Sequence, residues 1–360
     1  MSRPLLTIDQ ATREFESWLA RQTNVVRADL RVKHRRMAGD PFTFLRATFY
    51  RWLQVFPRVC DKLLNAPRIL AVGDLHLENF GTWRDAEGRL IWGINDLDEA
   101  CELPYLHDLV RLATSARLAL RLRHLDLSLR EATDALIDGY VSSLRRDGRA
   151  VVLAERNAWL SQIAIAELHD PTTFWDELNA LSSGGRDAPQ RVIRAAMPAS
   201  VTQLRFARRV AGVGSLGRPR FVGVGMVGGS AVAREVKALV PSAAVWVTGK
   251  GERAEAKFQL LGKAPRVPDP FLSIRQGWVV RRLAPDCTKI GIDRLPRRRD
   301  HRKLLRAMGW ETANLHLGAA RSRTLQNDLK RRPKRWLEDA ARAMADVVLA
   351  DWKAWTKRRE

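Results

Sequence analysis

Two short segments carry oxygen-bearing side chains of the kinds that phosphoryl transfer requires. They are G-D-L-H-L-E-N-F-G at residues 73–81 and N-D-L-D-E-A at residues 95–100. Asp74 could accept the proton of a hydroxyl group. Asn79 and Asp96, with Asp98 beside them, could hold Mg²⁺, which prefers hard oxygen ligands. Phosphoryl transfer depends on positioning and charge neutralisation more than on covalent chemistry, so these residues predict a catalytic aspartate and a metal site.

A short β-hairpin is expected to bring these side chains together. Residues 68–72 form an apolar run, so Asp74 would follow the end of a strand. A second apolar run covers residues 90–94, and residues 85–88 between the two have turn chemistry. The same pattern also fits a structural hairpin whose carboxylates only cap turns. His76 taken alone is more typical of a packing and hydrogen-bonding histidine than of an acid or base.

A glycine-rich segment later in the chain could cover phosphates. It reads G-V-G-S-L-G at residues 212–217, and the candidate nucleotide contacts within it are Gly212, Gly214, Ser215 and Gly217. A dinucleotide site would need a helix to begin here, whereas the following Val and Gly residues favour a strand. Strand, glycine-rich turn and strand together form the phosphate-covering hairpin of kinases. The alternative is a glycine-rich hairpin without a ligand.

Lys237 is the candidate lysine for the phosphates. It lies twenty residues after Gly217, in a stretch expected to form the next strand. A kinase-type lysine needs a carboxylate partner, and Glu252 and Glu255 are weak candidates for it. The alternative is an ordinary surface lysine.

The order of the two motifs is unusual for a kinase. The glycine-rich segment follows Asp74 by about 140 residues, whereas in kinases the glycine loop precedes the catalytic aspartate. Either one motif is fortuitous or the fold is circularly permuted, which is acceptable when the original termini lie close together. If both motifs form one site, Gly214 and Lys237 must fold back over Asp96. A bridging phosphate chain then allows about 10 Å or a little more between the Asp96 carboxylate and the Lys237 ammonium.

The two acidic segments resemble the catalytic loop and metal-binding segment of the aminoglycoside and choline kinase-like phosphotransferases. Their patterns are H-G-D-x-H-x-x-N and I-D-F/W-x-D/E. By this resemblance Asp74 corresponds to the catalytic aspartate, and Asn79 and Asp96 correspond to the metal ligands. Val72 stands where the first histidine of the pattern usually does. Asp108 matches a structural aspartate that opens the next helix in that superfamily.

The chain as a whole resembles the bacterial "domain of unknown function 2252" family over about residues 35–325. The resemblance is carried, in the family's order, by D-P-F-T-F-L-R (40–46), G-D-L-H-L-E-N-F-G (73–81), N-D-L-D-E-A (95–100), V-G-S-L-G (213–217) and V-V-R-R-L (279–283). That family is similar to the protein-kinase-like superfamily, so the resemblance implies its fold and chemistry without naming an acceptor. An E-G-Q-R-like segment found in other members has no clear counterpart here.

The succession of elements predicts an α+β chain with a kinase-like, bilobal and circularly permuted fold. Residues 1–200 are expected to form a helical lobe with the catalytic loop and metal-binding hairpin. Residues 201–290 would form a small β-rich nucleotide lobe, in which the runs 245–247 and 278–280 are strand-like. Residues 291–360 would form basic helices that pack back on the helical lobe.

Charge and composition narrow the classes of function. The 360 residues carry a formal net charge of +22, and residues 281–360 alone contribute +12. Weak, sequence-independent nucleic-acid binding is therefore one expectation, and solvated helix faces around core tryptophans are the alternative. Three distant cysteines, no secretory signal and no apolar stretch of ~20 residues predict a cytoplasmic protein without a membrane partner.

These observations predict a phosphotransferase that uses ATP and Mg²⁺ on a small-molecule hydroxyl acceptor. One alternative is a nucleotide-binding pseudokinase or a basic scaffold that contacts nucleic acid. Another is a kinase-like fold that transfers a nucleotidyl group. A pseudokinase would normally have lost Asp74, Asn79 or Asp96, and all three are present. Their presence favours catalysis.

Overall fold

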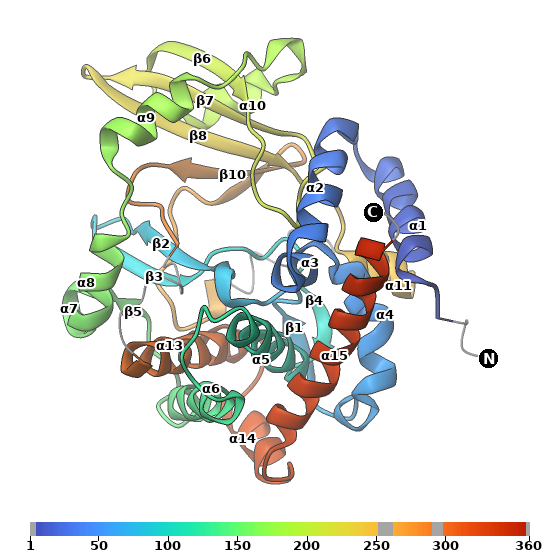
Figure 1. The fold of residues 1–360 in the computed structure, drawn as a ribbon. Helices are drawn as coiled ribbons and strands as arrows, with labels where there is room; N and C mark the ends of the chain where they lie inside the picture. Colours follow the sequence, from blue (N-terminus) through green and yellow to red (C-terminus); the bar gives the residue numbers. More distant parts are fainter. Residues whose placement is uncertain (1–4, 251–261, 290–297, 358–360) are drawn as a thin grey trace.

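The computed structural model describes residues 5–250, 262–289 and 298–357, which fold into helices and antiparallel sheets. The predicted α+β class is confirmed. The largest sheet has five strands in the order β6-β7-β8-β10-β9, and two smaller sheets have the orders β2-β3-β5 and β1-β4. In Figure 1 the five-stranded sheet forms the upper part of the molecule and most helices lie below it or beside it. The smaller sheets lie between these parts.

The smaller sheets support the two acidic segments. Their strands are β1 (Arg68–Ala71), β2 (Phe80–Arg84), β3 (Leu90–Ile94), β4 (Cys101–Pro104) and β5 (Val151–Val152). The strands predicted at residues 68–72 and 90–94 are therefore confirmed. The β2–β3 hairpin pairs Phe80 with Ile94. Just beyond that pair, the Asn95 amide donates to the Asn79 carbonyl at 3.0 Å, so both acidic segments leave the same end of the hairpin.

The glycine-rich segment connects two neighbouring strands of the large sheet. These strands are β6 (Thr202–Arg208), β7 (Arg220–Val227), β8 (Ser230–Ala238), β9 (Ser273–Arg275) and β10 (Trp278–Leu283). Strand, glycine-rich loop and strand is thus the arrangement between residues 202 and 227. Lys237 lies on β8 directly opposite Arg220, the first residue of β7. The register therefore places Lys237 at the end of the sheet where the glycine-rich loop lies.

The strand expected at residues 245–247 is wrong, because these residues belong to helix α11 (Ala243–Thr248). Ser242 caps this helix, its hydroxyl accepting from the Ala244 amide at 3.2 Å. Trp246 packs edge-on against Phe15 and Tyr50, with ring centroids 5.7 and 6.1 Å away. Local β propensity is here outweighed by a cap and by tertiary packing.

The N-terminal helices pack beside the small sheets. They are α1 (Ile8–Gln22), α2 (Arg27–Gly39), α3 (Pro41–Ala47) and α4 (Phe49–Val59), followed by the 3₁₀ turns η1 (Asp61–Leu63) and, after β1, η2 (Leu77–Asn79). Helix α3 begins where Asp40 accepts a hydrogen bond from the Thr43 amide at 2.7 Å. Pro41 occupies its first position, where a missing amide hydrogen costs nothing.

Long helices form the lower part of the molecule. They are α5 (Leu106–Arg121), α6 (Leu129–Leu144), α13 (Arg298–Leu317), α14 (Ser322–Lys330) and α15 (Trp336–Lys357). Helix α13 packs on α6, and α15 packs on α5. Gly139 of α6 and Gly309 of α13 permit the close packing of these two helices, because a Cβ at either position would clash with the backbone of the other helix. Trp355 of α15 is buried in the core rather than displayed on a surface.

A third group of helices includes two that cover the large sheet. The group comprises α7 (Leu153–Arg156), α8 (Ala158–Ala166), α9 (Pro171–Asn179), η3 (Gly185–Asp187) and α10 (Gln190–Ala196). Phe174 of α9 packs with Val222, and Ile193 of α10 packs with Val236. Although α9 and α10 precede residue 201, their apolar residues therefore belong to the core of this sheet. The predicted boundary at residue 201 stays a prediction.

None of the described helices combines the length and the apolar character that crossing a lipid bilayer would require.

Candidate functional site

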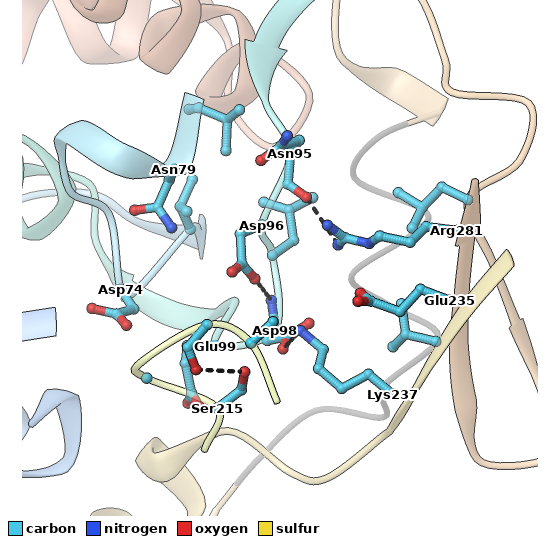
Figure 2. A pocket seen from close by; sticks show the side chains of 18 of the residues that line it. Asp74, Asn79, Asn95, Asp96, Asp98, Glu99, Ser215, Glu235, Lys237 and Arg281 are labelled. Atoms are coloured by element: carbon cyan, nitrogen blue, oxygen red, sulfur yellow. Dashed lines mark hydrogen bonds and ion pairs between the residues drawn. The ribbon is translucent and has the colours of Figure 1, made fainter. Parts of the chain in front are cut away.

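One cavity of about 540 Å³ is lined by residues from both motifs. Figure 2 shows the acidic side chains of the small hairpin facing Lys237, Glu235 and Arg281 of the large sheet. The predicted site residues that line the cavity are Asp74, Asn79, Asp96, Asp98, Gly212, Gly214, Ser215 and Lys237. Gly217 does not line it and packs beside helix α2. The fold thus brings the two motifs together across the gap in the sequence.

Asp108 holds the backbone that leads to Asp74. Its buried carboxylate accepts hydrogen bonds from the Val72 and Gly73 amides at 2.7 and 2.9 Å. Burial raises the pKa of Asp108, but hydrogen bonds with His107 and His316 outweigh it and hold this pKa well below the usual range. Gly73 has φ +82°, and a Cβ there would clash with the backbone carbonyl of Glu99 in the second acidic segment. The turn before Asp74 is therefore fixed from two sides.

Asp74 is paired with a buried arginine of helix α5. The Arg111 Nε donates to the Asp74 carboxylate at 2.7 Å, and its guanidinium lies over the rings of Phe49 and Trp52. Burial raises the pKa of Asp74 to about 7, against the opposing charge of Arg111 and with a contribution from Glu99. This carboxylate therefore changes its charge near neutral pH, which suits a group that exchanges protons.

Asp96 is the carboxylate best suited to a metal. Within the described chain it forms no ion pair with a basic side chain inside 4.0 Å. Burial alone would raise the pKa of Asp96, but the charges of Lys237, Arg281 and Lys289 hold it well below the usual range. Asp96 is therefore ionised at neutral pH and available to a cation.

The donor set suits magnesium better than a softer metal. Asn79 contributes an amide oxygen that also accepts from the His76 amide at 2.6 Å. No group of three or more His, Cys, Asp and Glu side chains able to hold a metal occurs among the described residues. Mg²⁺ commonly uses only one or two carboxylates and completes its shell with water and phosphate oxygens. Asp96 and Asn79 fit that pattern.

Lys237 has an aspartate partner. Its ammonium pairs with Asp98, whose carboxylate also lies 3.5 Å from Arg218. Burial would raise the pKa of Asp98, but Lys237 contributes the largest opposing effect and the pKa is lowered. The proposed partners Glu252 and Glu255 lie outside the described residues. Asp98, predicted to assist the metal, thus connects the lysine to the acidic hairpin, which is the β2–β3 hairpin together with the acidic segments 73–81 and 95–100 at its end.

The glycine-rich loop passes directly over Asp74. A Cβ at Gly214 would lie 2.9 Å from the Arg46 carbonyl and 3.7 Å from the Asp74 carboxylate, so only glycine fits without a shift. Arg220 donates to the Ser215 hydroxyl at 2.6 Å, and the Val26 amide of the α2 cap donates to the Gly217 carbonyl at 2.9 Å. The loop is therefore held between the large sheet and helix α2.

Arg111 is a functional candidate that the sequence reasoning missed. It lies on α5 three residues after Asp108 and four before Ser115, whose hydroxyl accepts from the Leu77 amide at 3.2 Å. All three side chains are fully buried. A polar stripe at helical spacing within an apolar helix was the available signal.

Glu235 and Arg281 were also missed. Glu235 is two residues from Lys237 on β8, so the two side chains share a face of the sheet. Its carboxylate pairs with Arg209 and, at 2.9 Å, with Arg220. Arg281 donates to the Asn95 carbonyl at 3.2 Å, across the cavity. The alternation of Glu235 and Lys237 along the strand could have indicated Glu235. The contact of Arg281 with the Asn95 carbonyl depends on the tertiary structure, so no local pattern could have indicated it.

Fold and site define an α+β protein in which a cavity beside the five-stranded sheet is lined by both acidic and basic side chains. Residues 25–205 and 188–358 match the sequence model of a family described as "uncharacterized protein conserved in bacteria (DUF2252)". The two matches span most of the chain, so the protein belongs to this family. No curated protein and no solved structure matches the chain.

Proposed function

We propose that the protein is a phosphotransferase with a circularly permuted, kinase-like arrangement, using ATP and Mg²⁺ on a small-molecule hydroxyl. The main support for this proposal is that residues of the acidic hairpin, residues of the glycine-rich loop and Lys237 line the same cavity. The two motifs are about 140 residues apart in the sequence. If they form one nucleotide site, they must line the same cavity.

The two sides of the cavity would have different roles in this reaction. Asp96 and Asn79 would hold Mg²⁺, which neutralises charge on the phosphates when bound. The amides of residues 212–217 would cover the phosphate chain, and Lys237 would leave Asp98 to contact it. The ion pair of Lys237 with Asp98 keeps the lysine next to the metal ligands.

Asp74 would act on the acceptor. The acceptor hydroxyl gives its proton to the Asp74 carboxylate while its oxygen forms a bond to the γ-phosphorus, and the bond from that phosphorus to the ADP oxygen breaks. Arg111 holds the carboxylate in position from α5. The position of Gly214 over Asp74 would place the loop around the transferred group and limit access of water.

Three classes of function predict different products when the protein is incubated with Mg²⁺–ATP and a metabolite extract. Phosphoryl transfer, which we expect, releases ADP only in the presence of an acceptor. Nucleotidyl transfer releases pyrophosphate, and a pseudokinase or scaffold binds without turnover. Pyrophosphate release, or binding without ADP formation, would contradict the proposal.

Burial raises the pKa of Asp74 to about 7, and this base must be ionised to take a proton. The value of kcat/KM should therefore rise with pH through about 7.

A further inference from the structure

Lys33 is a buried cation at the Asp74 end of the cavity. It belongs to helix α2, lines the cavity and is only 2% exposed. Its ammonium lies 3.4 Å from the Gly214 carbonyl and 5.9 and 5.6 Å from the ring centres of Phe15 and Tyr50. Among the residues that the structure describes, no carboxylate lies within ion-pair distance of it. Burial lowers the pKa of Lys33 to about 8.

A buried ammonium of this kind is costly unless a counter-ion compensates it. One long hydrogen bond and two aromatic faces provide only part of that compensation. Arg46 lies at the same end of the cavity and pairs with Glu78 at 2.6 Å, yet its Nε is buried without a hydrogen-bond partner. Lys33 and Arg46 thus both line the cavity with N–H groups that no protein acceptor satisfies.

The cavity as a whole carries an excess of positive charge. Its lining contains ten Lys and Arg side chains against six Asp and Glu side chains. Three of these ten basic side chains pair with carboxylates outside the lining: Arg46 with Glu78, Arg266 with Glu311 and Arg282 with Asp286. Lys237 already faces Asp98, and Figure 2 shows that pair away from Asp74. Among the described residues, Lys33 and Lys289 line the cavity without an ion-pair partner, and Lys33 is the one that lies next to the Gly214 carbonyl, over Asp74.

We propose that the acceptor carries an anionic group, a phosphate or a carboxylate, which Lys33 binds next to Asp74. This inference rests on the proposed function. The acceptor hydroxyl would face Asp74, and its anionic group would take the place that no protein carboxylate fills. Phe15 and Tyr50 would contact the non-polar part of the same molecule. A cationic acceptor would meet Lys33 and Arg46 and be repelled.

Inorganic phosphate and choline are the probes that test this inference, with binding measured by calorimetry. Phosphate should bind wild-type protein saturated with a magnesium complex of a non-hydrolysable ATP analogue, and choline should not. Lys33→Met keeps the length of the side chain without its charge and should weaken phosphate binding at least ~10-fold. Arg35→Met is the matched control, because Arg35 is exposed on the same helix. Lys33→Gln repeats the test if the methionine variant folds poorly.

The possible results distinguish two groups that Lys33 could bind: an anionic group of the acceptor and the γ-phosphate of the nucleotide. Phosphate binding that survives the ATP analogue and depends on Lys33 supports an acceptor subsite. Displacement of phosphate by the ATP analogue but not by Mg²⁺–ADP would assign Lys33 to the γ-phosphate and overturn the inference. Absent phosphate binding, an unchanged affinity in Lys33→Met, or choline binding would also overturn it. If the free protein binds phosphate through Lys33 but binds no magnesium–nucleotide complex, the proposed function fails while the anion site stands.

Discussion

Asp74→Asn is expected to lower the rate of ADP formation by about 10³-fold while leaving Mg²⁺–ATP affinity within about threefold of wild type. Asparagine keeps the shape of the side chain and can still accept a hydrogen bond from Arg111, but it cannot take a proton from the acceptor. Asp74 accepts the acceptor proton in the proposed reaction and is not a metal ligand. The loss should therefore fall on kcat, which steady-state kinetics with the acceptor found in the metabolite screen would measure.

Asp134→Asn is the control for this substitution. Asp134 is exposed on α6 and lies outside the cavity, so the same chemical change should leave the rate unaltered. Thermal unfolding of both variants checks that the pairing with Arg111 is not needed for folding. An Asp74→Asn protein that folds and retains a wild-type rate would remove Asp74 from the reaction.

Asp96→Asn is expected to weaken Mg²⁺–ATP binding by about 100-fold. The carboxylate is held ionised by surrounding basic side chains and has no ion-pair partner within the described chain, so its replacement removes a charged metal ligand. Titration calorimetry with and without Mg²⁺ separates the metal from the nucleotide. Without Mg²⁺, ATP should bind the variant as well as wild type or better, because a negative charge facing the phosphates has gone.

The Mg²⁺ dependence is the decisive part of this second experiment. Asp134→Asn again serves as the matched control and should bind Mg²⁺–ATP like wild type. If Asp96→Asn and wild type respond equally to Mg²⁺, the acidic hairpin does not hold the metal. Its carboxylates would then serve only to organise the basic side chains that face them.

Local patterns in the sequence were sufficient to predict the supports of the site. The apolar runs at residues 68–72 and 90–94 form strands because each is bounded by turn residues. The glycine-rich segment connects two strands because valines follow it and no helix begins within it. The local sequence therefore indicates which strands carry the two motifs, but not how those strands meet in space.

The contacts between these elements could not be predicted in the same way. Lys237 pairs with Asp98 only because β8 and the acidic hairpin meet across the cavity. Arg111 reaches Asp74 from a helix that follows it by more than thirty residues, and Lys33 reaches Gly214 from a helix far before it. Residues 245–247 have strand-like composition but are capped and packed as a helix. Each of these depends on tertiary packing rather than on local sequence.

In the proposed site, the acidic hairpin and the glycine-rich loop bind one magnesium–nucleotide complex. Hydrogen–deuterium exchange with and without Mg²⁺–ATP tests this joint binding, because it reports on both segments in one sample. We predict that Mg²⁺–ATP slows exchange at residues 73–81, 95–99 and 211–217 together, leaves α14 unchanged, and has no such effect on Asp96→Asn. Slower exchange in only one of the two motifs, or in neither, would contradict the claim.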